Sequence, residues 1–491
     1  MKKKIMFTEQ EISDLFGDLA AEDESKIRFK SHFFKNDTYK QIHNYLPLRV
    51  LVAHKGIGKS AIFRMSYIEN TESNILSLWL KPDDIADLGI ADTDESSLEL
   101  IRKWKSGLSE RIVDLVFGEI DADPVADGEQ LSKGVKIGIK VLDTIASVFK
   151  VVNENIALDP VRRNMVEKFL KDKKVIIYID DLDRAWDGSK ASINRVAALL
   201  NAARDMSNES EGLCFRISLR SDVYYLVRTA DESTDKIDGN VLWLSWTEHQ
   251  LLVLLAKRVQ SYFGVSVSEK DLMKKPQFEI VKLLYDIMES HFMGDGKWNN
   301  RPIQYILTSL IRRRPRDLIN LCTLAARCAN QNDHSKIETT DWEEVFAQYS
   351  LSRLQDTINE HRYELQDIER LLLGMKPSKD AKKLSGSFVY DEEKLIAKIS
   401  GIMQNGKFHF TNAHEATEKE LIAFMYKINF LVGRKDASDG YVDRKYFEDN
   451  RYLSTSYADF GYKWEVHPAF RWALYPEARD IFRELDSPLL V

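Results

Sequence analysis

Residues 50–65, VLVAHKGIGKSAIFRM, place a glycine-rich loop between two segments of different periodicity. The apolar, β-prone run from Leu48 to Val52 precedes the loop, and apolar residues at helical spacing follow it. A strand, a loop and a helix in this order present backbone amides and the positive end of a helix dipole to a bound anion. The segment is therefore typical of a phosphate-binding loop in an α/β fold.

The loop departs from the pattern G-x-x-x-x-G-K-[ST] at its first position, where Ala53 replaces glycine. A methyl group is tolerable there if φ is negative, while Gly56 and Gly58 supply backbone freedom where the chain passes closest to the phosphates. We therefore predict a nucleotide-binding loop formed by Ala53, His54, Lys55, Gly56, Ile57, Gly58, Lys59, Ser60 and Ala61.

A second motif lies in KKVIIYIDDLDRAWDG, where the apolar run Val175 to Ile179 ends in Asp180 and Asp181. Continuous β-branched runs of this kind are typical of central strands in parallel sheets. A carboxylate at the end of such a strand can hold the waters of Mg²⁺, and the next acidic residue can orient an attacking water. This is a Walker B pattern. The alternative is that the acidic residues only cap the helix that begins near Ser189.

Three further strands are expected at residues 74–80, 213–219 and 241–246, separated by helical stretches. Together with the two motif strands they predict a doubly wound, five-stranded parallel α/β sheet. A mostly helical insertion fills about 83–173. Within it, residues 134–152 carry Lys136, Lys140, Asp143 and Lys150, which would be costly at a bilayer centre, so we expect no membrane span. We expect an amphipathic helix buried against the body or a partner, and the alternative is a membrane-surface helix.

Arginines lie at the end of one expected strand and at the start of one expected helix. Arg220 ends the fourth strand, where it could contact a terminal phosphate or form a salt bridge with Asp222. Arg312, Arg313, Arg314 and Arg316 surround Pro315 at a helix start. Four arginines in five residues suggest an anionic target, either phosphate or DNA, and the alternative is a solvated basic face.

The chain divides into three expected domains. Residues 1–247 form the P-loop NTPase core, residues 248–375 a helical lid with connecting helices, and residues 376–491 an α+β, winged-helix-like domain after a lysine-rich linker. Winged helices bind DNA in some proteins and dock proteins in others. His467, in EVHPAF, has no carboxylate or cysteine at a motif spacing, and we interpret it as structural.

Composition restricts the partners and the compartment. The net charge of −7, from 70 basic and 77 acidic residues, gives no global attraction to nucleic acid or an anionic membrane. Cys214, Cys322 and Cys328 have neither a paired framework nor metal spacing, and the lysine-rich start lacks the apolar stretch of a signal peptide. We therefore expect a cytoplasmic protein.

The segments AHKGIGKSA, IDDLDR, SLRSD, VLWLSWTEHQLLVLLAKRV and RRPRDLI together resemble the additional-strand P-loop ATPases near the KAP, STAND and origin-recognition branches. They most resemble a bacterial P-loop ATPase family whose members begin with a segment like FG-x-x-x-AED, here residues 16–23. The resemblance implies that Lys59 and Ser60 contact phosphate and Mg²⁺ and that Asp180 contacts Mg²⁺. It also implies Asp181 as the catalytic acid, with Arg220 and Arg316 as first and second sensors. Many relatives of the wider group have glutamate at the position of Asp181.

Two classes of function follow. The first is a Mg²⁺-dependent ATPase that works as a switch or motor through a partner or a homo-oligomer, with a role in bacterial anti-phage or mobile-element defence implied by the resemblance. The second is a nucleotide-gated DNA-binding or scaffold protein with little hydrolysis. In that case the winged-helix-like domain or the cluster from Arg312 to Arg316 would contact DNA.

Overall fold

The computed structural model describes residues 5–18, 23–90, 96–119, 160–182, 186–230, 232–377, 388–411, 414–436, 442–451 and 461–475, with short pieces inside 142–150 and at 453–454. The chain forms two compact units. The sheet unit comprises Lys35–Leu244, and the flanking unit comprises Met1–Phe34 with Ser245–Val491. The phosphate-binding loop lies in the sheet unit.

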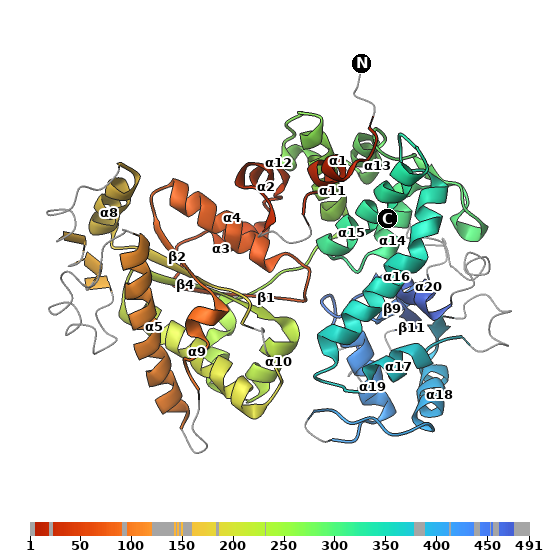
Figure 1. Cartoon of the computed structure of the whole chain (residues 1–491). Helices are drawn as coiled ribbons and strands as arrows, with labels where there is room; N and C mark the ends of the chain where they lie inside the picture. The colour runs from red at the N-terminus through yellow and green to blue at the C-terminus, as the bar shows by residue number, and fades with distance from the viewer. Residues whose placement is uncertain are drawn as a thin grey trace. The chain divides into compact units, whose positions relative to one another are not determined.

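Helices and strands alternate along the sheet unit, as the sequence predicts (Figure 1). Its elements are α3 (Asp37–Ile42), β1 (Leu48–Ala53), α4 (Lys59–Glu72), β2 (Leu76–Leu80), the 3₁₀ helix η2 (Pro82–Ile85), α5 (Ser97–Glu119), α8 (Pro160–Asp172), β3 (Val175–Ile179), α9 (Lys190–Glu209), β4 (Leu213–Arg220), α10 (Ser221–Ala230), the 3₁₀ helix η3 (Glu232–Asn240) and β5 (Val241–Trp243).

The five strands form one parallel sheet in the order β2-β3-β4-β1-β5, which confirms the predicted fold class. β4 pairs with β1 on one side and with β3 on the other. Its register places Ala53 opposite Arg220 and Ile179 opposite Ile217. The strand of the loop and the strand of the acidic motif therefore both end beside β4. An inserted strand at this position defines the additional-strand class of P-loop NTPases.

Helices cover both faces of the sheet, with α3 and α4 on one face and α9 and α10 on the other (Figure 1). The α9 face is apolar. Alternate residues of β1, β2, β3 and β4 pack there against residues of α5, α9 and α10, in one cluster that includes Val50, Leu78, Ile177, Phe215 and Leu199. Burial of this apolar area is the main stabilising contribution to the sheet.

The opposite face, under α4, carries buried polar side chains. Tyr178 of β3 is fully buried, and its hydroxyl makes hydrogen bonds of 2.8 Å with Ser66 Oγ and with Asn70 Nδ2, both on α4. Burial raises the pKa of the Tyr178 hydroxyl to about 12, so it stays neutral. These bonds fix α4, and with it the loop at its start, against β3.

Arg216 of β4 is also fully buried on this face. Its guanidinium donates to backbone carbonyls at the end of α3 and just after it, with Nε 2.8 Å from Ile42 O, Nη1 2.9 Å from Leu46 O, and Nη2 bonded to Asn44 O. Burial lowers the pKa of Arg216. The arginine ties the segment that leads into β1 to the centre of the sheet, because a buried guanidinium needs acceptors for its donors.

The flanking unit is mostly helical. Its elements are α1 (Glu9–Phe16), α2 (Lys26–His32), α11 (Glu248–Tyr262), α12 (Glu269–Leu272), α13 (Gln277–Val281), η4 (Lys282–Leu284), β6 (His291–Phe292), η5 (Gly296–Trp298), β7 (Arg301–Pro302), α14 (Ile303–Leu310), α15 (Pro315–Gln331), α16 (Thr339–His361), α17 (Ile368–Gly374), β8 (Val389–Tyr390), α18 (Glu392–Met403), α19 (Glu418–Lys427), β9 (Leu431–Asp436), β10 (Val442–Lys445), β11 (Lys463–Val466), η7 (Pro468–Phe470) and α20 (Arg471–Leu474).

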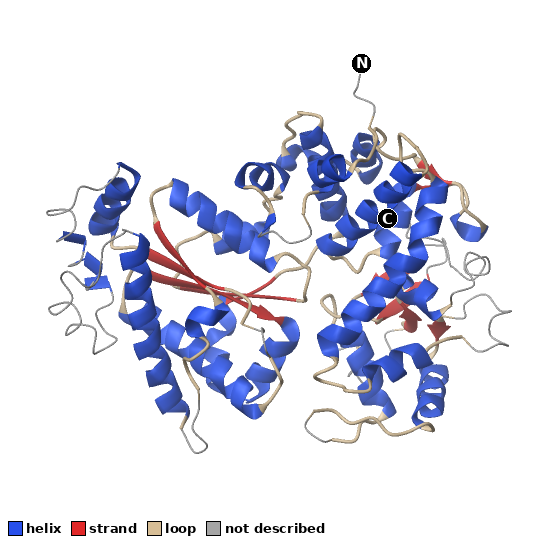
Figure 2. Ribbon diagram, in the orientation of Figure 1, coloured by secondary structure: helices blue, strands red, loops and turns tan. Residues whose placement is uncertain are grey.

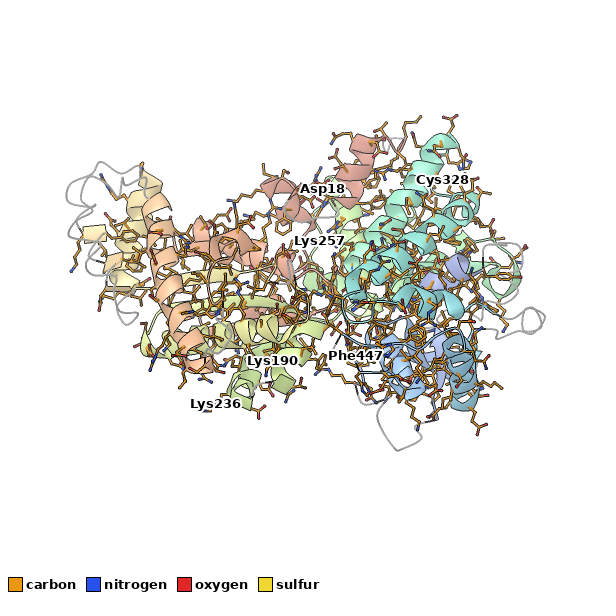
Figure 3. All side chains as sticks on the ribbon, turned by 60° about the horizontal axis from the view of Figure 1, so that its bottom comes forward. Asp18, Lys190, Lys236, Lys257, Cys328 and Phe447 are labelled. Atoms are coloured by element: carbon orange, nitrogen blue, oxygen red, sulfur yellow. The ribbon has the colours of Figure 1, made fainter. Side chains whose placement is uncertain are left out.

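The first 34 residues group with this unit, whereas the sequence placed them with the NTPase core. The reason is two basic residues of α11 that reach back to the N-terminal helices. Arg258 donates to the carbonyl of Phe16, and Lys257, labelled in Figure 3, donates to the carbonyl of Phe33. The segment 134–152 lies largely outside the described residues. No helix in the described part of the chain is both long and apolar enough to span a bilayer.

The C-terminal part of the flanking unit combines helices with a small sheet. An antiparallel sheet in the order β10-β9-β11-β8 accompanies α18 and α19 (Figure 2). The helix α20, which follows this sheet, packs against α16 of the predicted lid. Ser350 of α16 accepts a hydrogen bond of 2.9 Å from the backbone N–H of Ala473, and the ring centroids of Trp472 and Phe346 lie 5.0 Å apart. The predicted lid and tail therefore share a core.

His467 lies inside this shared core with 0% exposure. Its Nδ1 accepts from the backbone N–H of Ala469 at 3.1 Å, and its Nε2 lies 3.0 Å from the hydroxyl of Tyr446. Burial, followed by the charges of Arg444 and Arg312, holds the pKa of His467 well below its usual value. The imidazole is neutral and fully used in packing, which agrees with a structural role.

His467 should make stability depend on pH. Its pKa is lower in the folded chain than the ~6.5 of an unfolded histidine, so only the unfolded chain binds the proton as pH falls below ~6.5. The unfolding free energy of the wild type should therefore fall between pH 6.5 and 5 by up to ~1.4 kcal/mol per pH unit more than that of His467→Gln. Urea titrations at four pH values would measure the two slopes, and equal slopes would contradict the neutral assignment.

Candidate nucleotide-binding site

The phosphate-binding loop runs from the end of β1 to the start of α4 and depends on two glycines with positive φ. Gly56 has φ 78° and Gly58 has φ 106°. A Cβ at Gly58 would meet no atom within 4 Å, so the backbone angle, and not space, requires glycine there. Ala53 is the last residue of β1, and its φ is not positive. A methyl group is therefore accepted at the first position of the loop.

The start of α4 is arranged to receive an anion. Gly58 is its N-cap residue, and no side chain caps the helix. The first amides of α4 therefore keep their capacity to donate to a ligand. Lys59 Nζ lies 3.3 Å from the carbonyl oxygen of Ala53 and donates to it, which holds the ammonium group over the loop. Ser60 is the second residue of the helix and is half-buried.

One loop residue is anchored to the neighbouring strand in a way that the sequence did not reveal. His54 is buried, and its Nδ1 lies 3.0 Å from Ser221 Oγ, the first residue of α10. This contact ties the second position of the loop to the end of β4. Ser221 directly follows Arg220 in the sequence, but no local pattern indicates that it contacts His54, which lies far away along the chain.

Asp180 follows β3 and is 4% exposed. Its Oδ1 accepts a hydrogen bond from Ser218 Oγ on β4. Side chains alternate along a strand, so Asp180 shares the α4 face with Tyr178. Asp180 and Ser60 thus offer a carboxylate and a hydroxyl on the face that carries the loop. An all-oxygen donor set completed by phosphate and water suits Mg²⁺.

Asp180 and Asp181 do not cap the next helix, so the capping alternative is wrong. The N-cap of α9 is Ser189, whose side chain accepts from the backbone of Ser192. Asp187 accepts from the backbone N–H of Ser189 at 3.0 Å and from Ser192 Oγ at 2.6 Å. The N-terminus of α9 is therefore capped by Ser189 and supported by Asp187.

Asp181 is exposed and has φ 56°, a conformation that aspartate adopts more readily than most residues. It lines a cavity whose walls also include Ser192 and Arg195 of α9. None of the loop residues 53–61 contributes to that cavity. The proposed catalytic acid therefore borders the α9 side of the sheet, and its role in hydrolysis stays a prediction.

Arg220 ends β4 and is 7% exposed. Its Nη2 lies 2.7 Å from Asp222 Oδ2, and its Nε lies 3.1 Å from Asp222 Oδ1. The salt bridge that we gave as the alternative is therefore present, but it is buried and not on the surface. Because Arg220 lies opposite Ala53 in the sheet, it borders the loop, and its role as a first sensor stays a prediction.

The arginine cluster is not an exposed basic patch. Arg312 and Arg314 are each 3% exposed; Arg312 Nε lies 2.8 Å from Asp317 Oδ2, and Arg314 Nη1 lies 3.4 Å from Glu360 Oε2. Burial alone would raise the pKa of Asp317, but arginine charges, first that of Arg312, hold it far below its usual value.

Arg313 is engaged as well, with contacts of 2.6 Å to Glu248 and 2.7 Å to Asp449. The alternative of a solvated basic face therefore does not hold for these three arginines, since each pairs with a carboxylate of the protein, and a DNA contact of the cluster stays a prediction. Arg316 differs: it is half-buried and makes no hydrogen bond or ion pair within the described residues. Arg316 belongs to the flanking unit and the loop to the sheet unit, so the sensor role of Arg316 stays a prediction.

The loop, the acidic motif and the strand order together define an additional-strand P-loop NTPase. Comparison with known proteins adds a domain match in the flanking unit. Residues 249–358, which run from α11 into α16, match a family model described as the FunZ-associated C-terminal helical domain. This range lies inside the region that we predicted as the helical lid.

Two curated proteins are similar in sequence. The chain is 24% identical over 530 residues to the 80.3 kDa protein of transposon gamma-delta from Escherichia coli K12, a match that covers 97% of this chain and 70% of the relative. It is 28% identical over 175 residues to the allergen Alt a 2 of Alternaria alternata, which covers 34% of this chain and 84% of the relative.

Solved structures are similar only distantly. The ORC2 protein of Aeropyrum pernix, in ADPNP and ADP complexes, gives a TM-score of 0.40 at 11% identity and covers 91% of this chain and 94% of its own. Cdc6p of Pyrobaculum aerophilum gives 0.33 at 11% identity, covering 96% and 99%. The ORC1 protein of Aeropyrum pernix in complex with DNA gives 0.34 at 12% identity, covering 97% and 94%. The fold assignment therefore rests on the strand order of this chain.

Arg316 offers a test of the second-sensor role. If its guanidinium contacts the terminal phosphate, Arg316→Ala should weaken ATP about ten- to 150-fold and leave ADP nearly unchanged, since a hydrogen bond to a charged group contributes ~1.5–3 kcal/mol. Calorimetric titration of both nucleotides would measure the ratio. Arg327→Ala is the matched control, because Arg327 lies on the same helix and pairs with Glu9 at the surface.

The same variant separates the sensor from a DNA contact. An unchanged ratio of ATP to ADP affinity, with a log-log salt slope for duplex DNA about one unit shallower, would assign Arg316 to DNA instead. Equal losses of ATP and ADP affinity would contradict both roles.

Proposed function

We propose that this chain is a Mg²⁺-dependent ATPase that acts as a switch or motor. The observation that carries the proposal is the position of β4. This strand lies between β1 and β3, and it brings the loop, Asp180 and Arg220 to one edge of the sheet. A phosphate-binding loop beside a buried carboxylate at the carboxyl ends of parallel strands is the arrangement that nucleoside triphosphate hydrolysis requires.

The residues would divide the work as follows. The loop amides and Lys59 bind the phosphates, and Lys59 exchanges its neutral acceptor, the carbonyl of Ala53, for a charged one. Ser60 and Asp180 would hold Mg²⁺, which would supply positive charge against the negative charge of the phosphates. Asp181 orients a water molecule and accepts its proton as the water attacks the terminal phosphorus, which releases ADP and phosphate.

Arg220 and Arg316 would report on the terminal phosphate. Arg220 borders the loop and would rearrange from its pair with Asp222, whereas Arg316 has no carboxylate partner among the described residues. A positive group that meets the terminal phosphate stabilises the ATP-bound state relative to the ADP-bound state. Such differential contacts would let hydrolysis reset the conformation.

The biological setting that we propose is a bacterial defence or mobile-element system, with the chain in the cytoplasm acting through a homo-oligomer or a separate effector. Its support is the similarity, along 97% of this chain, to a protein of a bacterial transposon. The winged-helix-like domain is a candidate contact for DNA or for that effector.

A second function is favoured by the placement of Asp181. This residue borders a cavity that contains no loop residue, and its side chain is one methylene shorter than glutamate. A chain with this geometry could bind ATP and hydrolyse it slowly, and so act as a nucleotide-gated DNA-binding or scaffold protein. Steady-state phosphate release, with and without duplex DNA, distinguishes this function from the first.

Paired substitutions test the proposed chemistry. Asp181→Asn should keep ATP affinity but abolish phosphate release, because an amide preserves the shape of the side chain yet accepts no proton at neutral pH. Lys59→Ala should instead weaken ATP binding about ten- to 150-fold, as expected for the loss of a hydrogen bond worth ~1.5–3 kcal/mol to a charged group. Lys55→Ala is the control for charge, since Lys55 is an exposed lysine of the same loop.

Calorimetry with a nonhydrolysable ATP analogue would measure the affinities, and a phosphate-release assay would measure turnover. If Asp181→Asn released phosphate at the wild-type rate, another residue would be the base. If Lys59→Ala bound the analogue as tightly as the wild type does, the loop would not be the phosphate site.

A further inference from the structure

One side chain of the phosphate-binding loop is buried and has no part in the proposed chemistry. His54, the second residue of the loop, is 3% exposed, and its Nδ1 lies 3.0 Å from the hydroxyl oxygen of Ser221, which is 2% exposed. The loop binds phosphate through its backbone amides and Lys59, so the imidazole of His54 need not touch the ligand. Its contact with Ser221 therefore calls for another role.

His54 and Ser221 directly follow a pair of residues in the parallel sheet. Ala53 ends β1 opposite Arg220, which ends β4, so the next residues of the two chains are also neighbours. Val52 of β1 packs in the core cluster under α9, and the alternation along the strand directs His54 to the same face. The imidazole therefore supports the loop from the face of α10, opposite to α4 (Figure 1).

Ser221 is a firm point of attachment for the loop. All eight positions of β4, which ends just before Ser221, are buried. The helix α10 begins at Ser221 and places Val223 and Tyr224 in the core cluster. The chain neighbours of Ser221, Arg220 and Asp222, pair with each other at 2.7 Å. The contact therefore ties the loop to a packed element, which holds a functional group more precisely than another loop does.

The loop needs such an attachment because glycines shape it. Gly56 has φ 78° and Gly58 has φ 106°. Glycine loses more conformational freedom on ordering than any other residue, so fixing the loop around a phosphate costs conformational entropy. A contact that fixes the loop before the ligand arrives lowers the ordering cost that binding itself must overcome.

We propose that His54 is a positioning residue of the nucleotide site, an inference that rests on the proposed function. Its contact with Ser221 holds the loop in the phosphate-binding conformation. Because the loop would bind phosphates that ATP and ADP share, loss of the contact weakens both nucleotides by the same factor. This pattern separates His54 from Arg220 and Arg316, whose proposed contacts are with the terminal phosphate.

Two amide substitutions separate the hydrogen bond of His54 from its packing. In His54→Asn the amide group takes the place of Nδ1, where it can donate or accept, so the contact with Ser221 is kept. In His54→Gln the amide takes the place of Nε2, and the contact is lost, although the side chain is closer to histidine in volume. A role in packing alone predicts the reverse order, with His54→Asn the more damaging change.

Calorimetric titration of the full chain with a nonhydrolysable ATP analogue and with ADP, both with Mg²⁺, measures the effect. We expect His54→Gln and Ser221→Ala each to weaken both ligands about tenfold, the effect of one buried hydrogen bond, and His54→Asn to stay near the wild type. The double variant should also lose about tenfold and not about a hundredfold, because both changes remove the same interaction.

Ser207→Ala is the matched control for Ser221→Ala. Ser207 is a buried serine of α9 whose hydroxyl donates to the carbonyl of Arg204 at 2.9 Å, and its loss should leave both affinities unchanged. If His54→Gln fails to fold, Ser221→Ala removes the same contact from the other side and carries the comparison.

Hydrogen exchange of the nucleotide-free chain tests the contact without a ligand. The amides of residues 54–61 should exchange about tenfold faster in His54→Gln and Ser221→Ala than in the wild type or His54→Asn, because local opening of the loop becomes easier. Exchange in β3 should be the same in all four proteins, which reports that the sheet is intact.

Several results would overturn the inference. They are wild-type affinities and wild-type loop exchange in His54→Gln, weaker binding by His54→Asn than by His54→Gln, a loss of ATP affinity alone, losses that multiply in the double variant, or equal losses in Ser221→Ala and Ser207→Ala. A wild type that binds neither nucleotide, but whose loop exchange depends on His54, would contradict the proposed function and not the contact. A wild type that binds both, with variants that bind equally well, would contradict the inference alone.

Discussion

The pairing of β4 with both β1 and β3 is the constraint on which the candidate site depends. The register of these pairs places Ala53 opposite Arg220. It also brings Ser218 of β4 beside Asp180, which accepts a hydrogen bond from the Ser218 hydroxyl. Each contact would be lost if one strand slipped by a single residue, because the side chains would then exchange faces. The apolar α9 face opposes such a slip, since it would place buried residues such as Ile177 and Phe215 among polar partners.

The two faces of the sheet carry different chemistry. On the α4 face, polar side chains of the strands fix the phosphate-binding loop. Tyr178 of β3 makes hydrogen bonds with α4, and Arg216 of β4 donates to the segment before β1. On the α9 face, Asp181 borders a cavity with tryptophan walls. Asp180 and Asp181 are consecutive, so the alternation of side chains along a strand directs them toward different faces, and Asp181 has φ 56°.

Much of the sheet unit was predictable because its signals are local. The glycine-rich loop, the apolar run before Asp180 and the alternation of strands and helices are each read within about 15 residues, and parallel sheets impose the rest. The contacts that position the site were not predictable, since their partners are distant in the sequence. Ser221 meets His54, and Ser218 meets Asp180, only after β4 has inserted between the other strands.

The arginine cluster shows the same limit from the opposite direction. Four arginines in five residues indicate a basic surface, yet Arg314 pairs with Glu360, and Arg313 with Asp449, across long stretches of chain. The grouping of the first 34 residues with the flanking unit also depends on distant partners, because Arg258 of α11 donates to the carbonyl of Phe16. Local charge patterns give no information about the carboxylates and carbonyls that tertiary structure brings to them.

The dependence of ATP affinity on Mg²⁺ tests the central claim most directly. An equilibrium titration of ATP, with Mg²⁺ and with a chelator, would compare the wild type with Asp180→Asn. If β4 brings Asp180 to the phosphate site, Mg²⁺ should tighten ATP binding in the wild type, and the variant should lose that gain while keeping the affinity measured in chelator. An identical Mg²⁺ effect in both proteins, or no binding of ATP by the wild type, would contradict the account.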